Sequence, residues 1–153
     1  MLSKISAVVM LGSFVGWVIV CWRLAMKHAI PLGSAADLLE LTLVELCAAL
    51  RSRRASAVEL MEAVLGAVDE THEALNALVA RRPTEELLAE ARLSDRRLQR
   101  GQGRALEGVP LAVKDLEDAA GLVTSHGSVP FRDNQAARDS IQVERLKAAG
   151  AIV

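Results

Sequence analysis

The last third of the chain reads as a strand, a helix and the start of a second strand, and this order constrains the fold most. Residues 108–113 read Gly-Val-Pro-Leu-Ala-Val, a short apolar run typical of a buried strand. A helix is expected from Asp139 to about Ala149, ended by Gly150, and Ala151–Val153 begins another strand. Such an order predicts a right-handed parallel crossover in a protein of the α/β class.

A lysine, Lys114, stands at the carboxyl end of the first strand. Open α/β sheets gather their chemistry at that end of their strands. Loss of water around an ammonium group favours its neutral form, so Lys114 is a candidate proton carrier. From the local pattern alone, the alternative is a strand-end lysine that points into solvent. Neighbours on a strand face opposite sides, so Asp115 is expected to serve a turn or a cap and not to pair with this lysine.

Several pieces of sequence follow in a fixed order around this lysine. Gly108-Val-Pro-Leu-Ala-Val-Lys-Asp115 precedes Gly121, Thr124-Ser-His-Gly-Ser128, Asp139 and the run from Val143 to Val153. Their order and spacing resemble the N-terminal part of the amidase signature catalytic domain, over roughly residues 41–153. The resemblance implies a layered α/β fold with helices packed on a mixed sheet, and an activity that hydrolyses or transfers carboxylic amides.

The resemblance also implies a catalytic set of a lysine, a serine in a cis peptide and a nucleophilic serine. By position, Lys114 matches the lysine. It would take a proton from the bridging serine, which takes one from the nucleophile, and would return a proton to the leaving amine. Both serines are expected beyond Val153, and Ser125 and Ser128 read as loop polar groups. The chain alone is therefore expected not to hydrolyse amides.

No metal or organic cofactor is implied, because this chemistry needs only a lysine, two serines and backbone donors. Cys21 and Cys47 are the only cysteines, and no Cys/His spacing suggests zinc. Both read as small buried hydrophobic residues. His126 follows the lysine strand and could line a pocket, although a solvent-facing loop position suits it better.

The run Ile5–Trp22 carries no charge over 18 residues. As a helix it would span about 27 Å, close to the roughly 30 Å hydrocarbon core of a bilayer. Lys4 flanks one end and Arg23 the other, and the tryptophans lie where an interface is expected. A hydrophobic N-terminal helix that anchors the protein in a membrane is the first interpretation; a cleaved signal peptide and an untranslated upstream extension are the alternatives.

The chain is accordingly divided into three parts. Residues 1–30 form the hydrophobic anchor or signal segment, residues 31–41 a linker, and residues 42–153 a partial amidase signature domain. The localisation expected from this division is membrane-associated. The expected partners are a small-molecule amide in the full-length enzyme and the membrane through residues 5–22, and a homo-oligomer is compatible with the sequence. A net charge of −1 and a short basic cluster without aromatic neighbours give no indication of nucleic-acid binding.

Helix signals fill the region between the linker and the lysine strand. Thr42 with Glu45, and Ser56 with Glu59, match the capping-box pattern. We expect the apolar face of the helix after Ser56 to consist of Val58, Met61, Leu65 and Val68, and residues 76–80 to form a short strand or extended segment. Thr84 is expected to cap the next helix, with Leu87, Ala91 and Leu98 along its apolar side. Asp139 with Gln142 resembles another capping pair.

Two functions are compatible with this organisation. The first is an amidase that works through the two serines and Lys114, represented here by its N-terminal part. The second is a non-catalytic, membrane-tethered interaction module derived from an amidase domain, whose missing strands come from another polypeptide. An incomplete gene model is a third reading. The strand that begins at Ala151 favours the first, because an independent domain seldom ends inside a buried strand.

Overall fold

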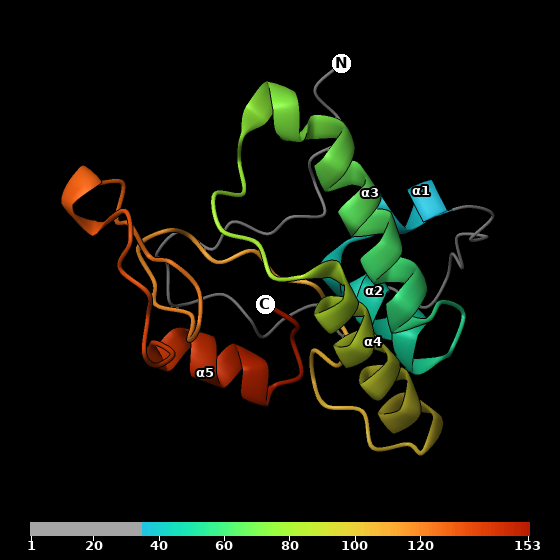
Figure 1. Cartoon of the computed structure of the whole chain (residues 1–153). Coiled ribbons are helices and arrows are strands. Elements are labelled where there is room, and N and C mark those ends of the chain that lie inside the picture. The colour runs from blue at the N-terminus through green and yellow to red at the C-terminus, as the bar shows by residue number, and fades with distance from the viewer. Residues whose placement is uncertain (1–34) are drawn as a thin grey trace.

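The computed structural model describes residues 35–153, a set of helices joined by long loops (Figure 1). The predicted hydrophobic helix over residues 5–22 lies outside the described residues. No helix within residues 35–153 is both long and apolar enough to cross a membrane. The elements, in chain order, are α1 (Ala35–Leu39), α2 (Leu43–Arg51), α3 (Ala57–Leu75), α4 (Thr84–Gln99), the 3-10 helix η2 (Val129–Phe131) and α5 (Ile141–Ala148).

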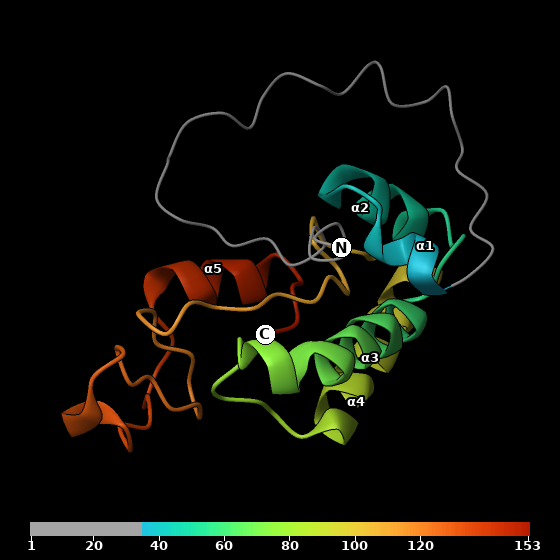
Figure 2. The ribbon, with the colours of Figure 1, turned by 90° about the horizontal axis from the view of Figure 1, so that it is seen from above.

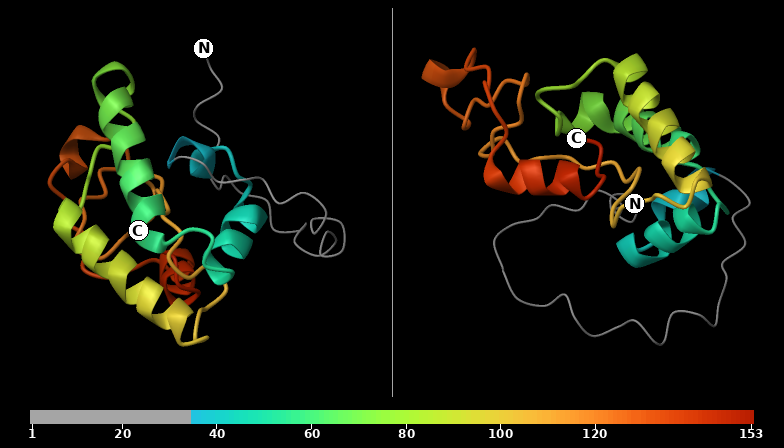
Figure 3. Two further views of the ribbon diagram at one scale, coloured as in Figure 1. Left: turned by 90° about the vertical axis from the view of Figure 1, so that its right-hand side faces the viewer. Right: turned by 90° about the horizontal axis from the view of Figure 1, so that it is seen from below.

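The first four helices gather on one side of the molecule, and α5 lies on the other with the loops that precede it (Figures 1 and 2). Helix α3 packs along α4, and α1 lies against α3 (Figure 3). The four helices α1–α4 supply most of the core, including the fully buried Leu50 of α2 and Leu60 of α3. The sequence predicts a linker over residues 31–41, yet α1 forms within it, because Leu38 and Leu41 reach this core.

Helix starts are set by side chains that bond otherwise unpaired backbone amides. Both predicted capping boxes, at Thr42 and Ser56, are confirmed. A further cap at α3 comes from a different helix: the Asp95 carboxylate of α4 accepts hydrogen bonds from the amides of Ala57 at 2.6 Å and Val58 at 3.3 Å. This contact fixes the start of α3 against the middle of α4.

Two predicted helix caps are wrong. Thr84 is the first residue of α4 instead of its cap, and Pro83 precedes it as the N-cap without a side-chain bond. Ser140 caps α5, because the Asp139 carboxylate is already bonded to Ala120 and Lys147. Of the two alternatives for residues 76–80, the strand is not formed, as Asn76 adopts the left-handed conformation that ends α3.

The predicted parallel pairing between residues 108–114, here called the lysine segment, and the end of the chain is present. Pro110 and Ile152 form a parallel bridge. Four backbone hydrogen bonds accompany it: Leu106 N to Ala149 O, Gly108 N to Gly150 O, Ile152 N to Val109 O and Leu111 N to Ile152 O, at 2.7–3.0 Å. The mixed sheet expected from the resemblance is not formed within residues 35–153, where bridges occur only as isolated pairs.

A buried carboxylate, Glu107, holds this pairing against α4. Its oxygens accept hydrogen bonds from Arg97 at 3.1 Å and from the Arg104 guanidinium at 2.6 and 3.0 Å. Burial raises the pKa of Glu107, but hydrogen bonds from Arg104 and Ser94 outweigh this and lower it from 4.5 to about 2. Gly150 packs directly on Glu107, since a Cβ there would lie 2.8 Å from the Glu107 Cα. One charge therefore joins α4, the lysine segment and the end of α5.

We expect Glu107→Gln to lower the free energy of unfolding by about 3 kcal/mol at neutral pH. The estimate follows from a pKa of about 2 in the folded state against 4.5, at about 1.4 kcal/mol for each pKa unit. Because the folded pKa is depressed, the contribution is complete above pH 4.5 and is lost as the pH falls to about 2. Urea unfolding followed by circular dichroism should show the difference between the two proteins shrinking over that window. A difference that does not change with pH would contradict the prediction.

Gly108 tests how closely the lysine segment approaches α3 and α4. Its φ is +79°, and an added Cβ would lie 2.6 Å from the Ala57 Cβ and 3.3 Å from the Ser94 Cβ. The matched control is Gly101, whose φ is +69° and whose Cβ would meet nothing within 4 Å. We expect Gly101→Ala to cost about 1–2 kcal/mol from backbone strain alone. Gly108→Ala should cost about 1–3 kcal/mol more from overpacking. Equal losses in urea unfolding would show that the close approach is absent.

Candidate active site around Lys114

Lys114 follows the parallel pairing by three residues, since Leu111 is the last residue bonded to Ile152. The chain then turns sharply: the Lys114 carbonyl accepts hydrogen bonds from the amides of Leu116 at 2.7 Å and Glu117 at 3.0 Å. The Lys114 side chain is exposed and forms no salt bridge with any residue of the described part of the chain. The lysine thus projects from a segment whose backbone is fixed on both sides.

Asp115 turns away from Lys114 and binds a distant loop. One carboxylate oxygen accepts a hydrogen bond from the Ser125 amide at 2.6 Å. The other accepts from the Ser125 hydroxyl at 2.5 Å and from the Gly127 amide at 3.2 Å. The Ser125 hydroxyl holds the pKa of Asp115 below its ordinary value, against the opposing effect of burial. Asp115 lies in a turn and forms no salt bridge with Lys114, as expected from the sequence, but its carboxylate binds a distant loop instead of capping a helix.

Residues 121–136 form a hairpin beyond this contact. Val123 and Gln135 make an antiparallel bridge, and the amides of Gly121 and Thr124 donate to Ala136 and Asn134 at 2.9 Å. Thr124 is buried and its carbonyl accepts a further bond from the Asn134 side chain. The base of the hairpin is therefore closed by its own hydrogen bonds.

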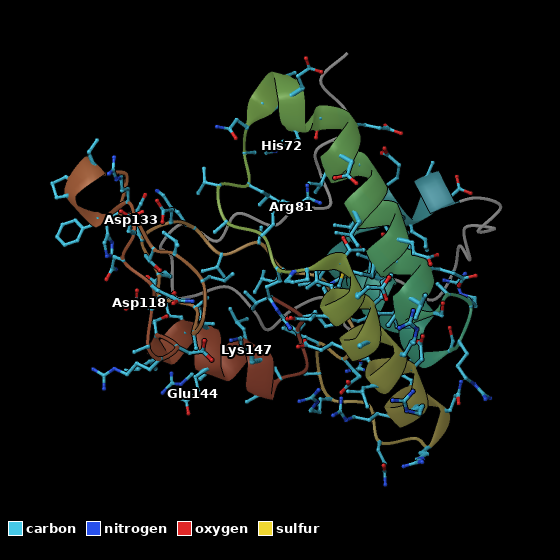
Figure 4. The ribbon with its side chains drawn as sticks, viewed as in Figure 1. His72, Arg81, Asp118, Asp133, Glu144 and Lys147 are labelled. Carbon is cyan, nitrogen blue, oxygen red and sulfur yellow. The ribbon has the colours of Figure 1, made fainter. Side chains whose placement is uncertain are left out.

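The tip of this hairpin projects away from the helices, as the position of Asp133 shows (Figure 4). Val129 of η2 is 75% exposed and Phe131 is 50% exposed. The His126 ring is also exposed and packs edge-on against Phe131, with ring centroids 5.7 Å apart. The solvent-facing interpretation of His126 is confirmed, and the histidine supports an apolar tip instead of lining a pocket.

A cleft of about 430 Å³ lies between α4, residues 119–122 and the terminal segment 150–153. Lys114 is not among the residues that line it. Its cations are already engaged: Arg82 bonds Glu90 and the Val153 carbonyl, Lys147 bonds Asp139, and Arg97 and Arg104 bond Glu107. We therefore place the candidate site at Lys114 and not in this cleft.

The described residues offer little to a metal ion. Nowhere in residues 35–153 do three or more His, Cys, Asp or Glu side chains come together in a way that could hold one. Cys47 is half-buried against the core, and burial raises the pKa of its thiol despite the nearby Arg51 charge. That agrees with its interpretation as a small hydrophobic residue; Cys21 lies outside the described residues.

Sequence reasoning found Lys114 and Asp115 but missed the partner of Asp115. Ser125 lies ten residues away in a loop whose path no local pattern predicts. The available signal was Gly127, two residues after Ser125, since a glycine lets a loop adopt positive φ and turn back. In the structure His126 has φ +52° and Gly127 φ +65°, and the amides of Ser125 and Gly127 both donate to the Asp115 carboxylate.

Comparison with known proteins places this geometry in a family. The model of the family described as Amidase matches residues 59–153, which include the parallel pairing, Lys114 and the hairpin. The chain belongs to the amidase family. The segment of this chain that matches the family begins inside α3 and runs through Val153.

Relatives of this amidase-family chain are known both as sequences and as structures. The A subunit of the glutamyl-tRNA(Gln) amidotransferase of Methylococcus capsulatus is 40% identical over 112 residues, covering 73% of this chain and 23% of the relative. Its counterpart from Nitrosococcus oceani is 38% identical with the same coverage. A solved structure described as an unexpected vestigial protein complex that reveals the evolutionary origins of an s-triazine catabolic enzyme has a TM-score of 0.67 and 38% identity. It is matched over 73% of this chain and 25% of its own length. The chain thus spans about a quarter of these proteins.

The Asp115 contact can be tested by removing the Ser125 hydroxyl. We expect Ser125→Ala to raise the pKa of Asp115 toward its ordinary value of 3.8, because this hydroxyl is the largest influence on it. Ser128→Ala is the matched control, since it removes a hydroxyl from the same loop that Asp115 does not contact. A carboxyl-detected NMR titration of both variants measures the change. An unaltered Asp115 titration in Ser125→Ala would contradict the geometry described above.

Proposed function

We propose that this chain is the lysine-bearing N-terminal part of an enzyme that hydrolyses or transfers carboxylic amides, and that Lys114 relays its protons. The observation that carries the proposal is the position of Lys114. It lies three residues beyond the parallel pairing, inside the segment that matches the amidase family. The similarity to two amidotransferase subunits supports the same broad class of substrate.

The proposed chemistry needs an amine that can both accept and donate a proton. Lys114 would accept the proton that a bridging serine receives from the nucleophilic serine, so that the nucleophile attacks the amide carbonyl. The same amine would then protonate the leaving nitrogen as the carbon–nitrogen bond breaks. Lys114 is available for these transfers, since no carboxylate of the described residues engages it in a salt bridge.

The remaining catalytic groups are proposed to come from chain that residues 35–153 do not include. In this proposal the two serines lie in a Gly/Ser-rich segment, and the single parallel bridge at Ile152 is the first pair of a larger mixed sheet. Residues 1–153 alone are then inactive. From the sequence only, we also propose that residues 5–22 anchor the protein at a membrane.

A chimera tests the role of Lys114. Residues 59–153 would replace the matching segment of the Methylococcus capsulatus relative, expressed with the other subunits of that amidotransferase. We expect the chimera to be active and Lys114→Ala to lower kcat about 10²–10⁴-fold, the usual loss when a general acid–base is removed. Arg92→Ala is the matched control, because it removes an exposed cation from α4 and should leave kcat unchanged. Comparable activity in the Lys114→Ala chimera would overturn the proposal.

A further inference from the structure

We propose that Asp115 is a positioning residue for Lys114. Its carboxylate ties the turn that follows the lysine to residues Ser125–Gly127, and so fixes the point from which the lysine side chain extends. This inference rests on the proposed function of Lys114. It adds the Asp115 side chain and its contact with residues 125–127 to a site in which the sequence identified Lys114 alone.

Several hydrogen bonds join Asp115 to residues 125–127. Ser125 donates its amide and its hydroxyl to the two Asp115 oxygens, at 2.6 and 2.5 Å, and Gly127 adds its amide at 3.2 Å. The Gly127 amide also reaches the Ser125 hydroxyl oxygen at 3.2 Å, so the donors brace one another. A carboxylate that is held by several donors has little freedom to rotate, and its own backbone is held with it.

The backbone of Lys114 is thereby fixed from both directions. Upstream, Leu111 is bonded to Ile152 of the parallel pairing. Downstream, the Lys114 carbonyl accepts two amide bonds from the turn, and the next residue is Asp115 with its loop contact. The amine of a long side chain can be positioned accurately only when the Cα of that residue is fixed. A displacement of about 1 Å at a reacting group can lower the rate about a hundredfold.

The contact also occupies the Asp115 carboxylate. The Ser125 hydroxyl holds the pKa of Asp115 below its ordinary value. Both carboxylate oxygens accept hydrogen bonds from residues 125–127, and no salt bridge joins Asp115 to Lys114.

Asp139 provides a matched structural carboxylate. It joins the loop at Ala120 to helix α5, through the Ala120 amide at 2.7 Å and the Lys147 ammonium at 2.7 Å. It contacts neither Lys114 nor the Ser125–Gly127 loop. Replacing a residue that only stabilises the fold should lower the melting temperature without lowering kcat, as expected for Asp139. Replacing a positioning residue should lower kcat more than its effect on the melting temperature explains.

The experiment uses the same amidotransferase chimera, with kcat, KM and melting temperature measured for each variant. Asp115→Ala should lower kcat about tenfold to a hundredfold with little change in KM, because the misplacement acts on the chemical step. Asp115→Asn should recover part of kcat, since its amide oxygen can accept from the Ser125 amide and its NH₂ can donate to the Ser125 hydroxyl, while the Gly127 amide loses its bond to this side chain. Asp139→Ala should lower the melting temperature without this fall in kcat.

Three results separate the possibilities. The positioning role is overturned if Asp115→Ala keeps its kcat. It is also overturned if Asp115→Asn does not recover kcat and both Asp115 variants have the same melting temperature as Asp139→Ala. If Asp115→Ala does not fold, Ser125→Ala replaces it and should give a smaller fall in kcat with unchanged KM; no fall overturns the proposal. If Lys114→Ala remains active, the proposed function itself fails, and the inference fails with it.

Discussion

The buried Glu107 carboxylate is the interaction on which the position of the candidate site depends. It accepts hydrogen bonds from two arginines that approach from α4 and from the loop after it. On its other side it packs against Gly150, which leads α5 into the parallel pairing. The helical half and the lysine-bearing half of the molecule therefore meet at one charge. Loss of this charge would weaken the packing of both segments against α4, although their four mutual backbone hydrogen bonds do not involve it.

Buried ion pairs seldom contribute much net stability, because removing charges from water costs several kcal/mol per ion. Their value here is in geometry. Hydrophobic contacts alone would tolerate a shift of the lysine segment along Ile152, whereas the Glu107 oxygens match two guanidinium groups in one arrangement only. We infer that this pair of halves is held in register by directional bonds and made compact by the Leu50 and Leu60 core.

The parts of the fold that depend on near neighbours were predictable from sequence. Capping boxes act across three residues, so Thr42 and Ser56 indicated the starts of α2 and α3. The parallel pairing of the lysine segment with Ile152 was expected because both are short apolar runs on either side of a helix, but within residues 35–153 it forms one isolated bridge and no strand. What escaped prediction involves bonds between distant polar residues: Asp95 at the start of α3, Asp115 with Ser125, and Asp139 with Lys147. A carboxylate has many possible donors in a chain, and only the packed backbone selects one.

The hairpin of residues 121–136 has a consequence for how the family can vary. Its base is closed by its own backbone bonds near Thr124, while Val129 and Phe131 at the tip contact the rest of the described chain little. Insertions or substitutions at the tip lie beyond the closed base and beyond the hydrogen bonds that join Ser125 and Gly127 to Asp115, and these bonds would keep Ser125 in place. The tip is accordingly a position where new surface chemistry can be acquired during evolution without moving the lysine.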